Sequence, residues 1–376
     1  MKKICIIATV PYALDVFMKP HIAMLSKYYD VVLITNGLEQ GVTSMLGKHV
    51  RSINVNFSRK VSLWQDVMTL FQLYQIFREE RFDLVHSLMP KTGLLAMVSA
   101  LAAGVPVRIH TFTGQVWANK KGFSRWALKN LDRLIATCAS GLLADSFSQR
   151  QYLIDHHVAN KNKITVLGNG SICGVDLKRF KADEGMRTQI RTTLGILNDD
   201  VVYLYLGRLN ADKGILDLAL AFASLTERLD NIHLVVVGPD ESNVSLRLEQ
   251  VLKTCQPQFH RVDFTYTAER YMACADVFCL PSYREGFGSV IIEAAAAGVP
   301  AIASNIYGLA DAVENGVTGI LHQPKNIGEI KSAMLEMYSQ DVRVKFSKQA
   351  FERTKSLFSS EIVVLAMRNY YQSVLH

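Results

Sequence analysis

The chain has 376 residues, which is enough for two or three domains and for two sizeable hydrophobic cores. Apolar residues make up 49% of it and charged residues 20%, an ordinary globular composition that argues against long disordered tails. Its six cysteines form no CxxC pair and follow no repeated spacing, so zinc sites and disulfide frameworks are not expected, and a reducing cytoplasm is the expected compartment.

The net charge of +7 is unevenly distributed along the chain. Residues 1 to 190 hold 24 Lys and Arg against 13 Asp and Glu, whereas the remainder holds 17 against 21. Only the first half is therefore expected to face an anionic partner, such as a membrane surface, a diphosphate-linked acceptor or nucleic acid. The chain has no zinc-finger spacing, no RNP-like aromatic run and no dense arginine tract, so no nucleic-acid partner is predicted.

The first segment, KICIIATV, is predicted to be a buried strand rather than part of a signal peptide. Its apolar run extends only from Ile4 to Val10 before Pro11, and no small-residue cleavage pattern follows at the usual distance. No stretch of the chain reaches the roughly 18 to 20 apolar residues of a membrane span.

In the first half, apolar runs of strand length alternate with amphipathic segments. Further strands are predicted at 30–36, 82–88, 105–112 and 141–146. A long helical pattern, with spacings of three and four, is formed by Leu63, Val67, Phe71, Tyr74 and Phe77. This order predicts a mostly parallel, doubly wound sheet. The loop after the first strand, TVPYALDVF, contains no glycine, which disfavours a Rossmann dehydrogenase.

A polar segment, KADEGMRTQIRTTLGILNDD, predicts a domain boundary near 180 to 198. The second half repeats the alternation, with strands predicted at 201–207, 233–239, 262–264, 277–280, 300–304 and 319–323. The expected architecture is therefore α/β, with two doubly wound, Rossmann-like parallel-sheet domains facing a cleft for a ligand. The domains are placed at 1–185, with the C-terminal helix 358–376 as a candidate to join it, and at 186–357.

The stretch PSYREGFGSVIIEAAAAGVPA, at 281 to 301, is predicted to be the centre of a ligand site. It follows the apolar run from Val277 to Leu280 and opens a helix, and ligands of open α/β sheets bind at the carboxyl ends of such strands. The free N–H groups and the dipole of the helix N-terminus favour an anion. Glu285 and Glu293 bracket the loop, and these carboxylates suit sugar hydroxyls on either side of a phosphate. A plain strand-loop-helix corner fits this loop about as well.

A second loop, GRLNADKGI at 207 to 215, follows the first strand of the second domain. Arg208 offers a planar fork and Lys213 a mobile point charge, so together they can clamp a diphosphate. Two basic residues in a loop are more often simply solvated. The pair supports a diphosphate site only in combination with the loop at 281 to 301.

These motifs resemble those of retaining family-4 glycosyltransferases, which have the GT-B fold. Glu285 and Glu293 match the E-x7-E signature, GRLNADKG resembles the family's diphosphate segment, and GNGSICGVDLKRF resembles its interdomain NGVD segment. The segment IHTFTGQVW is similar to a subgroup of bacterial enzymes that build surface polysaccharide on lipid carriers. The resemblance covers nearly the whole chain and is strongest from 201 to 321.

The resemblance assigns roles to individual positions. Expected catalytic residues are Glu285, Arg208 and Lys213. Expected contacts to a UDP- or GDP-linked sugar donor are Glu293, Phe287, Gly288, Ser289, Val290, Gly207, Tyr266 and Pro239. Expected residues on the acceptor side are Tyr12, His21, Lys91, His110, Thr113 and Gln115. No Asp-x-Asp occurs in the chain, so no metal and no cofactor beyond the donor substrate are expected.

The segment from Trp117 to Arg133 mixes aromatic and basic residues, with no acidic residue before Asp132. Such a mixture suits the headgroup region of an anionic bilayer. A helix packed on its own domain through Trp126 and Leu128 explains the segment equally well. The basic first half favours a peripheral position on the inner face of the cytoplasmic membrane.

The sequence thus predicts a metal-independent glycosyltransferase. It would move a hexose, with retention, from a nucleotide diphosphate sugar to a polyprenyl-diphosphate-linked saccharide, as in O-antigen or capsule biosynthesis. The alternatives are a GT-B sugar-nucleotide epimerase, a non-catalytic protein that binds sugar nucleotides, and a basic nucleic-acid binder.

Overall fold

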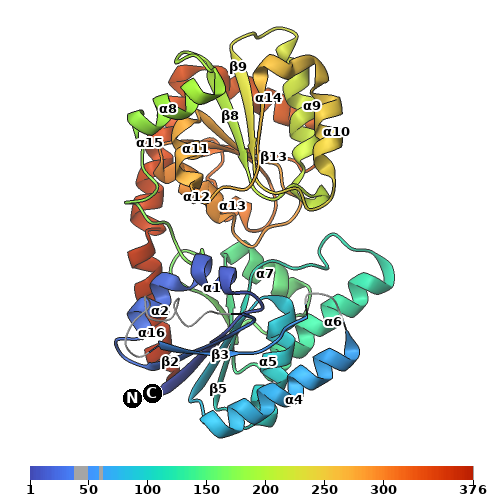
Figure 1. Ribbon diagram of the computed structural model, residues 1–376, viewed down its shortest axis with the longest axis vertical. Coiled ribbons are helices and arrows are strands. Elements are labelled where there is room, and N and C mark those ends of the chain that lie inside the picture. The colour runs from blue at the N-terminus through green and yellow to red at the C-terminus, as the bar shows by residue number, and fades with distance from the viewer. Residues whose placement is uncertain (38–49, 59–61, 376) are drawn as a thin grey trace. The chain divides into compact units, whose positions relative to one another are not determined.

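The computed structural model describes residues 1–37, 50–58 and 62–375 and divides into two compact units (Figure 1). Unit 1 comprises Met1–Gly174 and Ser360–His376, and unit 2 comprises Val175–Ser359. The first boundary lies earlier than position 185, where the polar segment suggested it. Val175 belongs to unit 2 because its backbone N–H donates to the carbonyl of Phe358, at 2.8 Å.

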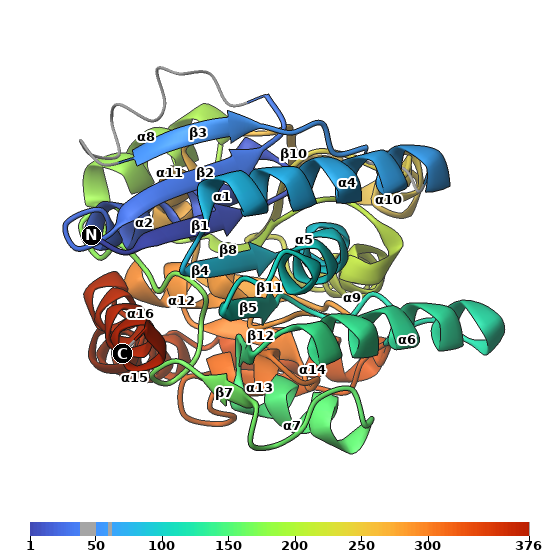
Figure 2. The same ribbon diagram turned by 90° about the horizontal axis from the view of Figure 1, so that it is seen from below.

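Unit 1 is built on a parallel sheet with the strand order β3-β2-β1-β4-β5-β6-β7 (Figure 2). The strands are β1 (Lys3–Ile7), β2 (Asp30–Thr35), β3 (Val50–Asn54), β4 (Leu84–Leu88), β5 (Val107–Phe112), β6 (Gly141–Ala144) and β7 (Ile164–Val166). β1 and β4 are almost entirely buried because they lie in the middle of the sheet, with both faces covered. β3 was not predicted, since VRSIN is a partly polar, half-exposed strand at the sheet edge.

Helices cover both faces of this sheet and produce two hydrophobic clusters. One face is covered by α4 (Leu63–Glu80), α5 (Pro90–Ala102), α6 (Gly122–Cys138) and α7 (Phe147–Asp155). The other face is covered by α1 (Pro11–Phe17), α2 (Lys19–Leu25) and α16 (Ser360–Leu375). Within the described ranges, no helix combines the length and the apolar character needed to cross a bilayer.

The last helix, α16, is part of unit 1 although it follows unit 2 in the sequence. Its Tyr371 is fully buried, and the phenol is hydrogen-bonded to Nδ1 of His86 on β4, at 2.7 Å. Nε2 of His86 is hydrogen-bonded to the hydroxyl of Thr111, also at 2.7 Å. The C-terminal helix therefore completes the core of the first unit.

The helix predicted from Leu63, Val67 and Phe71 exists as α4, but it presents that apolar stripe to solvent. Leu63 is 82% exposed, and Val67 and Phe71 are each 56% exposed. The side that packs on the sheet instead carries Thr69, Leu73 and Phe77, all buried. α4 thus carries exposed apolar side chains in addition to the side that packs on its own sheet.

Unit 2 is built on a second parallel sheet, with the strand order β10-β9-β8-β11-β12-β13. The strands are β8 (Val201–Leu206), β9 (Ile232–Val237), β10 (Phe259–Val262), β11 (Val277–Leu280), β12 (Ala301–Ser304) and β13 (Gly319–His322). The predicted position of β10 was wrong: the strand ends at Val262, so Asp263 and Phe264 belong to the loop after it. With two parallel sheets, the predicted α/β class is confirmed.

The second sheet is accompanied by helices and short 3₁₀ turns, and all of them except the first 3₁₀ turn contribute buried side chains to one continuous core. They are α8 (Glu184–Leu194), η1 (Ala211–Lys213), α9 (Ile215–Thr226), α10 (Val244–Val251), η2 (Lys253–Gln258), α11 (Ala268–Cys274), α12 (Ser289–Ala296), α13 (Leu309–Ala312), α14 (Ile327–Tyr338) and α15 (Gln340–Leu357). Because all the paired strands are parallel, the loops after β8, β9 and β11 gather at one edge of the sheet.

Candidate active site

The loops after the neighbouring strands β8 and β11 are in backbone contact. Gly214, with a φ of +64°, lies so close to Pro281 that a Cβ atom there would be 2.1 Å from the Pro281 carbonyl oxygen. The N–H of Tyr283 donates to the carbonyl of Asp212 at 2.8 Å. Only glycine fits at position 214, and its presence lets the basic loop lie against the glycine-rich loop.

This contact brings Lys213 and Glu285 together, although 72 positions separate them. Nζ of Lys213 lies 2.5 Å from Oε1 of Glu285, and both side chains are largely shielded from solvent. Beside them the phenol of Tyr283 donates to Asp217 at 2.5 Å. An ammonium group and a carboxylate predicted to act on the same substrate are therefore direct neighbours.

Glu285 of this pair lies in the loop that leads into the N-terminus of α12. Gly288 is the N-cap residue, with a φ of +80°, and a Cβ there would lie 2.4 Å from Leu309. Phe287 is buried, with its ring centroid 5.1 Å from that of Phe358, so it anchors the loop. Ser289 and Val290 follow and are half-buried. The N–H groups at such a helix start have no partner within the helix and favour an anion.

Arg208 lies on the exposed side of the same edge. Its Nη1 is 2.9 Å from Oε2 of Glu241, and its side chain is 58% exposed. The loops that hold it are in close contact, because a Cβ on Gly238 would lie 2.1 Å from the Gly207 carbonyl oxygen. The N–H of Leu209 donates to the carbonyl of Pro239 at 2.8 Å. The predicted residues Gly207, Arg208 and Pro239 are thus adjacent.

Glu293 lies within α12 among charges that the sequence did not reveal. Burial raises the pKa of Glu293 to about 7, while the charge of Arg179 lowers it and that of Glu269 raises it. Arg179 bonds to the carboxylate of Glu269 at 2.8 Å and donates to the carbonyl of Tyr266 at 2.9 Å. The ring of Tyr266 is exposed. Arg179 could have been found from its place in GVDLKRF, whereas Glu269 has no motif around it.

In unit 1, His110 is a buried member of a polar pair. Its Nδ1 is hydrogen-bonded to the hydroxyl of Ser87 at 2.8 Å, and its ring fills the space beside Gly93, where a Cβ would lie 2.3 Å from it. Burial lowers the pKa of His110 to about 3, so the imidazole is neutral near pH 7. Ser87 and His110 occupy paired positions on β4 and β5.

The other residues predicted on the acceptor side differ in how deeply they are buried and in what they contact. His21 is fully buried, and its Nε2 donates to the carbonyl of Ile172 at 2.7 Å. Its predicted place at an entrance for the acceptor is therefore wrong, because the imidazole fastens α2 to the core. Lys91 forms an ion pair with Asp66 of α4 at 2.7 Å. Tyr12 is exposed, Thr113 is half-buried and Gln115 is buried.

Asp145 is a buried acid of unit 1 that the sequence motifs did not indicate. Asp145 lies directly after β6, and burial raises the pKa of its carboxyl to about 8. Its N–H donates to the side-chain oxygen of Gln149 at 2.7 Å, and its carbonyl accepts from Ser171. The segment LADSFSQ gives no sign of a protonated carboxyl, since the shift arises from packing.

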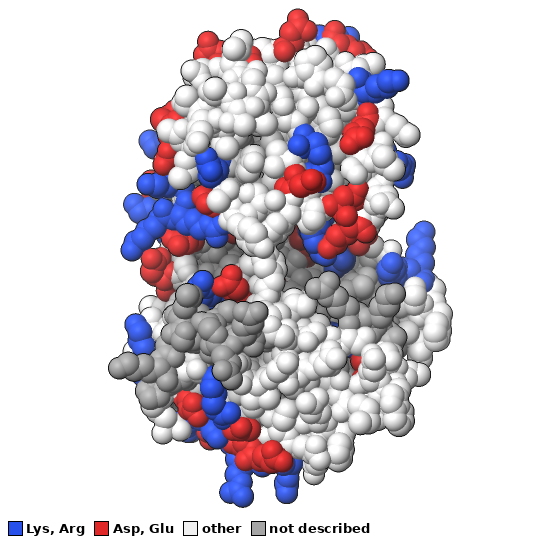
Figure 3. All heavy atoms as spheres, in the orientation of Figure 1, with Lys and Arg blue, Asp and Glu red and all other residues white. Residues whose placement is uncertain are grey.

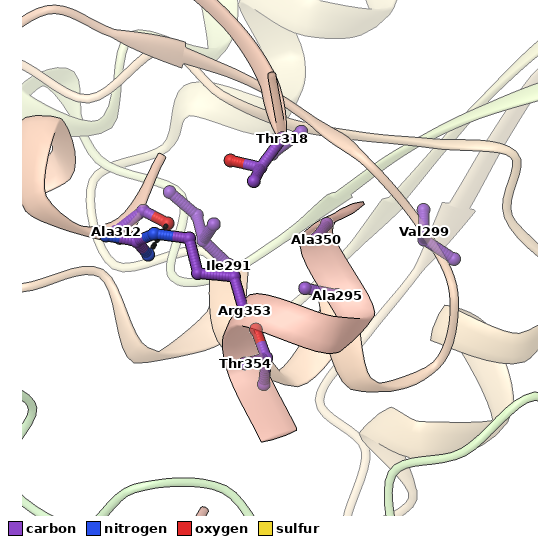
Figure 4. Close-up of a pocket in the computed structure, with 9 residues that line it drawn as sticks. Ile291, Ala295, Val299, Ala312, Thr318, Ala350, Arg353 and Thr354 are labelled. Atoms are coloured by element: carbon purple, nitrogen blue, oxygen red, sulfur yellow. Dashed lines mark hydrogen bonds between the residues drawn. The ribbon is translucent and has the colours of Figure 1, made fainter. Parts of the chain in front are cut away.

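Two further features bear on ligands. In the described part of the chain, no group of three histidine, cysteine or acidic side chains is arranged to hold a metal ion. Figure 4 shows a small cavity of about 10 Å³ in unit 2, between α12 and α15. It is lined by Ile291, Ala295, Arg353 and Thr354 among others, and it includes none of the predicted site residues. Its volume is about that of one water-sized sphere, which is too small for a nucleotide.

A cationic loop, a glycine-capped helix start and carboxylates lie together at one edge of a parallel sheet, an arrangement that suits an anionic ligand with hydroxyl groups. Two family models match the chain: "Glycosyl transferases group 1" over residues 186–353 and "Glycosyl transferase 4-like domain" over residues 23–170. The chain is 30% identical to the capsular polysaccharide biosynthesis glycosyltransferase CapM of Staphylococcus aureus, over 85% of this chain and 84% of that protein. The chain belongs to this glycosyltransferase family, as its motifs predicted.

Another relative and a solved structure agree. The chain is 29% identical to the UDP-Gal:α-D-GlcNAc-diphosphoundecaprenol α-1,3-galactosyltransferase of Escherichia coli, over 84% of this chain and 82% of that protein. The Anabaena protein HepE, solved in complex with UDP and glucose, superposes with a TM-score of 0.82 at 18% identity, covering 99% of this chain and 100% of that one. The last likeness supports the fold alone, which is GT-B.

Proposed function

We propose that this glycosyltransferase moves a hexose from a UDP- or GDP-linked donor to a saccharide on a polyprenyl diphosphate, in the assembly of a bacterial surface polysaccharide. The E. coli relative named above acts on such a lipid-linked acceptor with a UDP-linked sugar, and the S. aureus relative is a capsular polysaccharide enzyme. The observation that carries the proposal is the Lys213–Glu285 pair at the glycine loop before α12.

The geometry accounts for the departure of the nucleoside diphosphate. As the bond to the anomeric carbon breaks, negative charge builds up on the β-phosphate. The ammonium of Lys213 and the N–H groups at the start of α12 are fixed before the reaction, so they stabilise this charge without reorganising. Arg208 adds a second cation at the exposed edge. In this scheme a metal ion is not required.

Glu285 has two roles in this proposal. In the free protein it neutralises Lys213, and with donor bound it orients the hexose through the sugar hydroxyls. Retention follows if the acceptor hydroxyl attacks the face that the diphosphate leaves, with the leaving phosphate accepting the proton. No separate general base is then needed.

The acceptor would be bound by unit 1, at the carboxyl edge of its sheet. Ser87, His110 and Asp145 lie at or near the ends of β4, β5 and β6. These side chains are buried, so their neutral imidazole and protonated carboxyl place no charge under this edge that would repel a diphosphate. We also place the enzyme on the inner face of the cytoplasmic membrane, where a polyprenyl acceptor is found, and the basic first half of the chain supports this.

The proposal is tested with a panel of UDP- and GDP-linked sugars. The donor should raise the melting temperature by mass action, and only with a polyprenyl-diphosphate saccharide should a glycosylated lipid form, also in the presence of EDTA. An epimer formed from UDP-GlcNAc alone would make the protein an epimerase. Binding without turnover for any acceptor would make it a non-catalytic binder.

A substitution tests the site itself. Lys213→Ala should lower kcat by about 100-fold while changing the donor KM little, the size of effect seen when one preorganised donor to a developing anion is removed. Lys348→Ala, on the exposed surface of α15, is the matched control and should leave both constants unchanged. Equal kcat values for the two variants would contradict the assignment.

A further inference from the structure

The exposed face of the first half of α4 is an apolar patch without a charged side chain. Trp64 is 76% exposed, and Leu63, Val67, Met68 and Phe71 are all more than half exposed. The acid of these turns, Asp66, is directed away from this face and pairs with Lys91 of α5. We call Leu63, Trp64, Val67, Met68 and Phe71 the α4 patch. Soluble surfaces rarely leave so many large apolar side chains together without a partner.

α6 carries a second exposed patch of different composition. Phe123 and Trp126 are 78% and 62% exposed, and their rings are stacked with centroids 5.6 Å apart. Leu134 continues the stripe two turns later and is also exposed. The alternative of a helix packed on its own domain through Trp126 and Leu128 holds for Leu128, which packs against the core, and not for Trp126. Trp117 was expected among the membrane-facing residues, but it is buried and donates to Asp132 at 2.7 Å.

A row of cations borders the apolar stripe of α6. Arg125, Lys129 and Arg133 follow one another at intervals of four, so they share one side of the helix. Burial, together with the charges of Arg133 and Arg125, lowers the pKa of Lys129. Lys120 and Lys121 precede the helix and are exposed. The first acid after Trp117 is Asp132, whose carboxyl is buried and accepts a hydrogen bond from Trp117, so no exposed acid of α6 interrupts the row of cations.

The two patches lie on the same side of unit 1. α5 packs against both α4 and α6, and both helices begin at the carboxyl edge of the sheet, because each precedes a parallel strand. Figures 1 and 2 show the first turns of α4 and α6 projecting in the same direction. In Figure 3 the area over the first half of α4 is almost free of charged side chains, while Lys and Arg atoms gather at the edge over the start of α6.

We propose that α4 and α6 form one two-helix footprint that inserts into the surface of an anionic bilayer. This rests on the proposed function and deepens it, since it names the residues that contact lipid. The α4 patch and the Phe123–Trp126 pair would enter the headgroup and upper acyl region, where exposed tryptophans are favoured. Lys120, Lys121 and the cation row would contact the anionic headgroups.

Charge favours a bilayer over a second copy of the chain as the occupant. A two-fold contact through this surface would bring the patch of one copy onto the same patch of the other. The cation row beside the patch would then face its own copy, and like charges would repel. An anionic lipid surface offers the opposite charge to the same cations.

The three tryptophans provide the test, because each occupies a different environment. The Trp126→Phe variant keeps Trp64 on α4 and the buried Trp117, and its emission should be quenched by phosphatidylglycerol-rich vesicles that contain brominated lipid. The Trp64→Phe/Trp126→Phe variant keeps only Trp117 and should not be quenched. Quenching of Trp64→Phe but not of Trp126→Phe would show that α6 alone enters the lipid, and would overturn the two-helix footprint.

Vesicle sedimentation provides the second measurement. The variant Leu63→Gln/Val67→Gln/Phe71→Gln should lower partition to phosphatidylglycerol-rich vesicles by about tenfold or more, because it removes the inserted apolar area. The control Leu197→Gln/Leu246→Gln/Val344→Gln changes equally exposed apolar residues of unit 2 and should leave partition unchanged. Equal partition of both variants would overturn the proposal. So would a lipid-free wild-type dimer in sedimentation velocity that the α4 variant converts to monomer.

Activity separates this proposal from the function on which it rests. With a water-soluble, short-chain prenyl acceptor, the α4 variant should transfer sugar at the wild-type rate, and with a long-chain acceptor in vesicles it should be slower. If the wild type binds vesicles through α4 but transfers no sugar, the footprint stands and the proposed reaction fails. If it transfers sugar and the α4 variant is equally active on both acceptors, the footprint fails and the reaction stands.

Discussion

At the scale of single residues, the site is defined by charges that neutralise one another in the free protein. Lys213 is paired with Glu285 and Arg208 with Glu241, so each cation proposed to stabilise the diphosphate already has a carboxylate partner. The Lys213 pair is shielded from water, whereas the Arg208 pair is open to solvent and therefore contributes little to the stability of the fold. A bound diphosphate must displace these carboxylates, and the freed Glu285 is then available to the sugar.

Glu293 gives the donor site a pH dependence. Burial raises its pKa to about 7, so the side chain is largely protonated below that value and a carboxylate above it. The carboxylate accepts hydrogen bonds from sugar hydroxyls more strongly than the acid does. We expect the affinity for a UDP-linked sugar to increase between pH 6 and pH 8 and to level off above. Titration calorimetry at several pH values measures this, with a UDP-sugar because its diphosphate does not titrate in that range.

The matched control is Glu293→Gln, which cannot ionise and should bind the donor with an affinity that is flat over the same range. The same shift affects stability in the opposite sense. A carboxyl whose folded-state pKa is raised favours the folded state at low pH, and this advantage is lost as the pH rises through about 7. A wild-type affinity that falls between pH 6 and pH 8 would contradict the role of the carboxylate.

Single residues were predicted best where a motif fixes the backbone around them. The positions Gly288, Ser289 and Lys213 could be placed because strand, loop and helix follow directly from the local pattern. The environment of an aromatic or histidine side chain has no such local cause. Trp117 and His21 are buried, and their hydrogen-bond partners, Asp132 and Ile172, are not their neighbours in the sequence. The pairing of Lys213 with Glu285 likewise depends on two strands that are neighbours only in the folded sheet.

At the scale of elements, Gly214 joins the two loops of the site. It has a φ of +64°, and its α-carbon faces the Pro281 carbonyl so closely that no side chain fits. Gly195, at the end of α8, has a φ of +71°, but a Cβ atom at that position would have no neighbour within 4 Å. Both positions carry the same cost of left-handed backbone for a substituent, whereas only Gly214 carries the steric clash.

We expect Gly195→Ala to lower the free energy of unfolding by about 1 kcal/mol, the usual cost of placing alanine in the left-handed region. Gly214→Ala should cost more, and it should also weaken donor binding, because the clash with Pro281 moves the loop that carries Lys213 away from the loop that leads into α12. Urea denaturation and a donor titration of both variants measure the two effects. Equal losses of stability, with donor binding intact in both, would show that the loop contact is unimportant for the site.

The helices and strands could be predicted to different extents for physical reasons. Strands such as β9 and β11 were found because central strands of a parallel sheet are continuous apolar runs. β3 and β10 are partly exposed edge strands with mixed sequences, and they were missed or displaced. α4 was found by its periodicity, but periodicity cannot tell which apolar side faces the sheet. The stripe from Leu63 to Phe71 was expected of an amphipathic helix and instead faces solvent.

At the scale of the whole molecule, the residues expected to bind the donor and the basic and apolar surfaces lie in different units. All the residues expected to bind the donor lie in Val175–Ser359, whereas the basic surface and the apolar patches of α4 and α6 lie in unit 1. The chain enters unit 2 once and returns to unit 1 as α16, so unit 2 is one continuous segment inserted between the two segments of unit 1. Because the residues expected to bind the donor all lie in unit 2, binding of the nucleotide should change that unit first.

We expect UDP, without a sugar, to slow hydrogen exchange at backbone amides of residues 207–214 and 286–292, because it contacts the loops after β8 and β11 and the start of α12. Amides of α5 and β4 in unit 1 should exchange as in the free protein. Exchange followed by mass spectrometry with and without UDP measures both sets, and Lys213→Ala should reduce the protection of the first. Protection confined to unit 1, or absent from the start of α12, would place the nucleotide elsewhere and remove the basis of the proposed reaction.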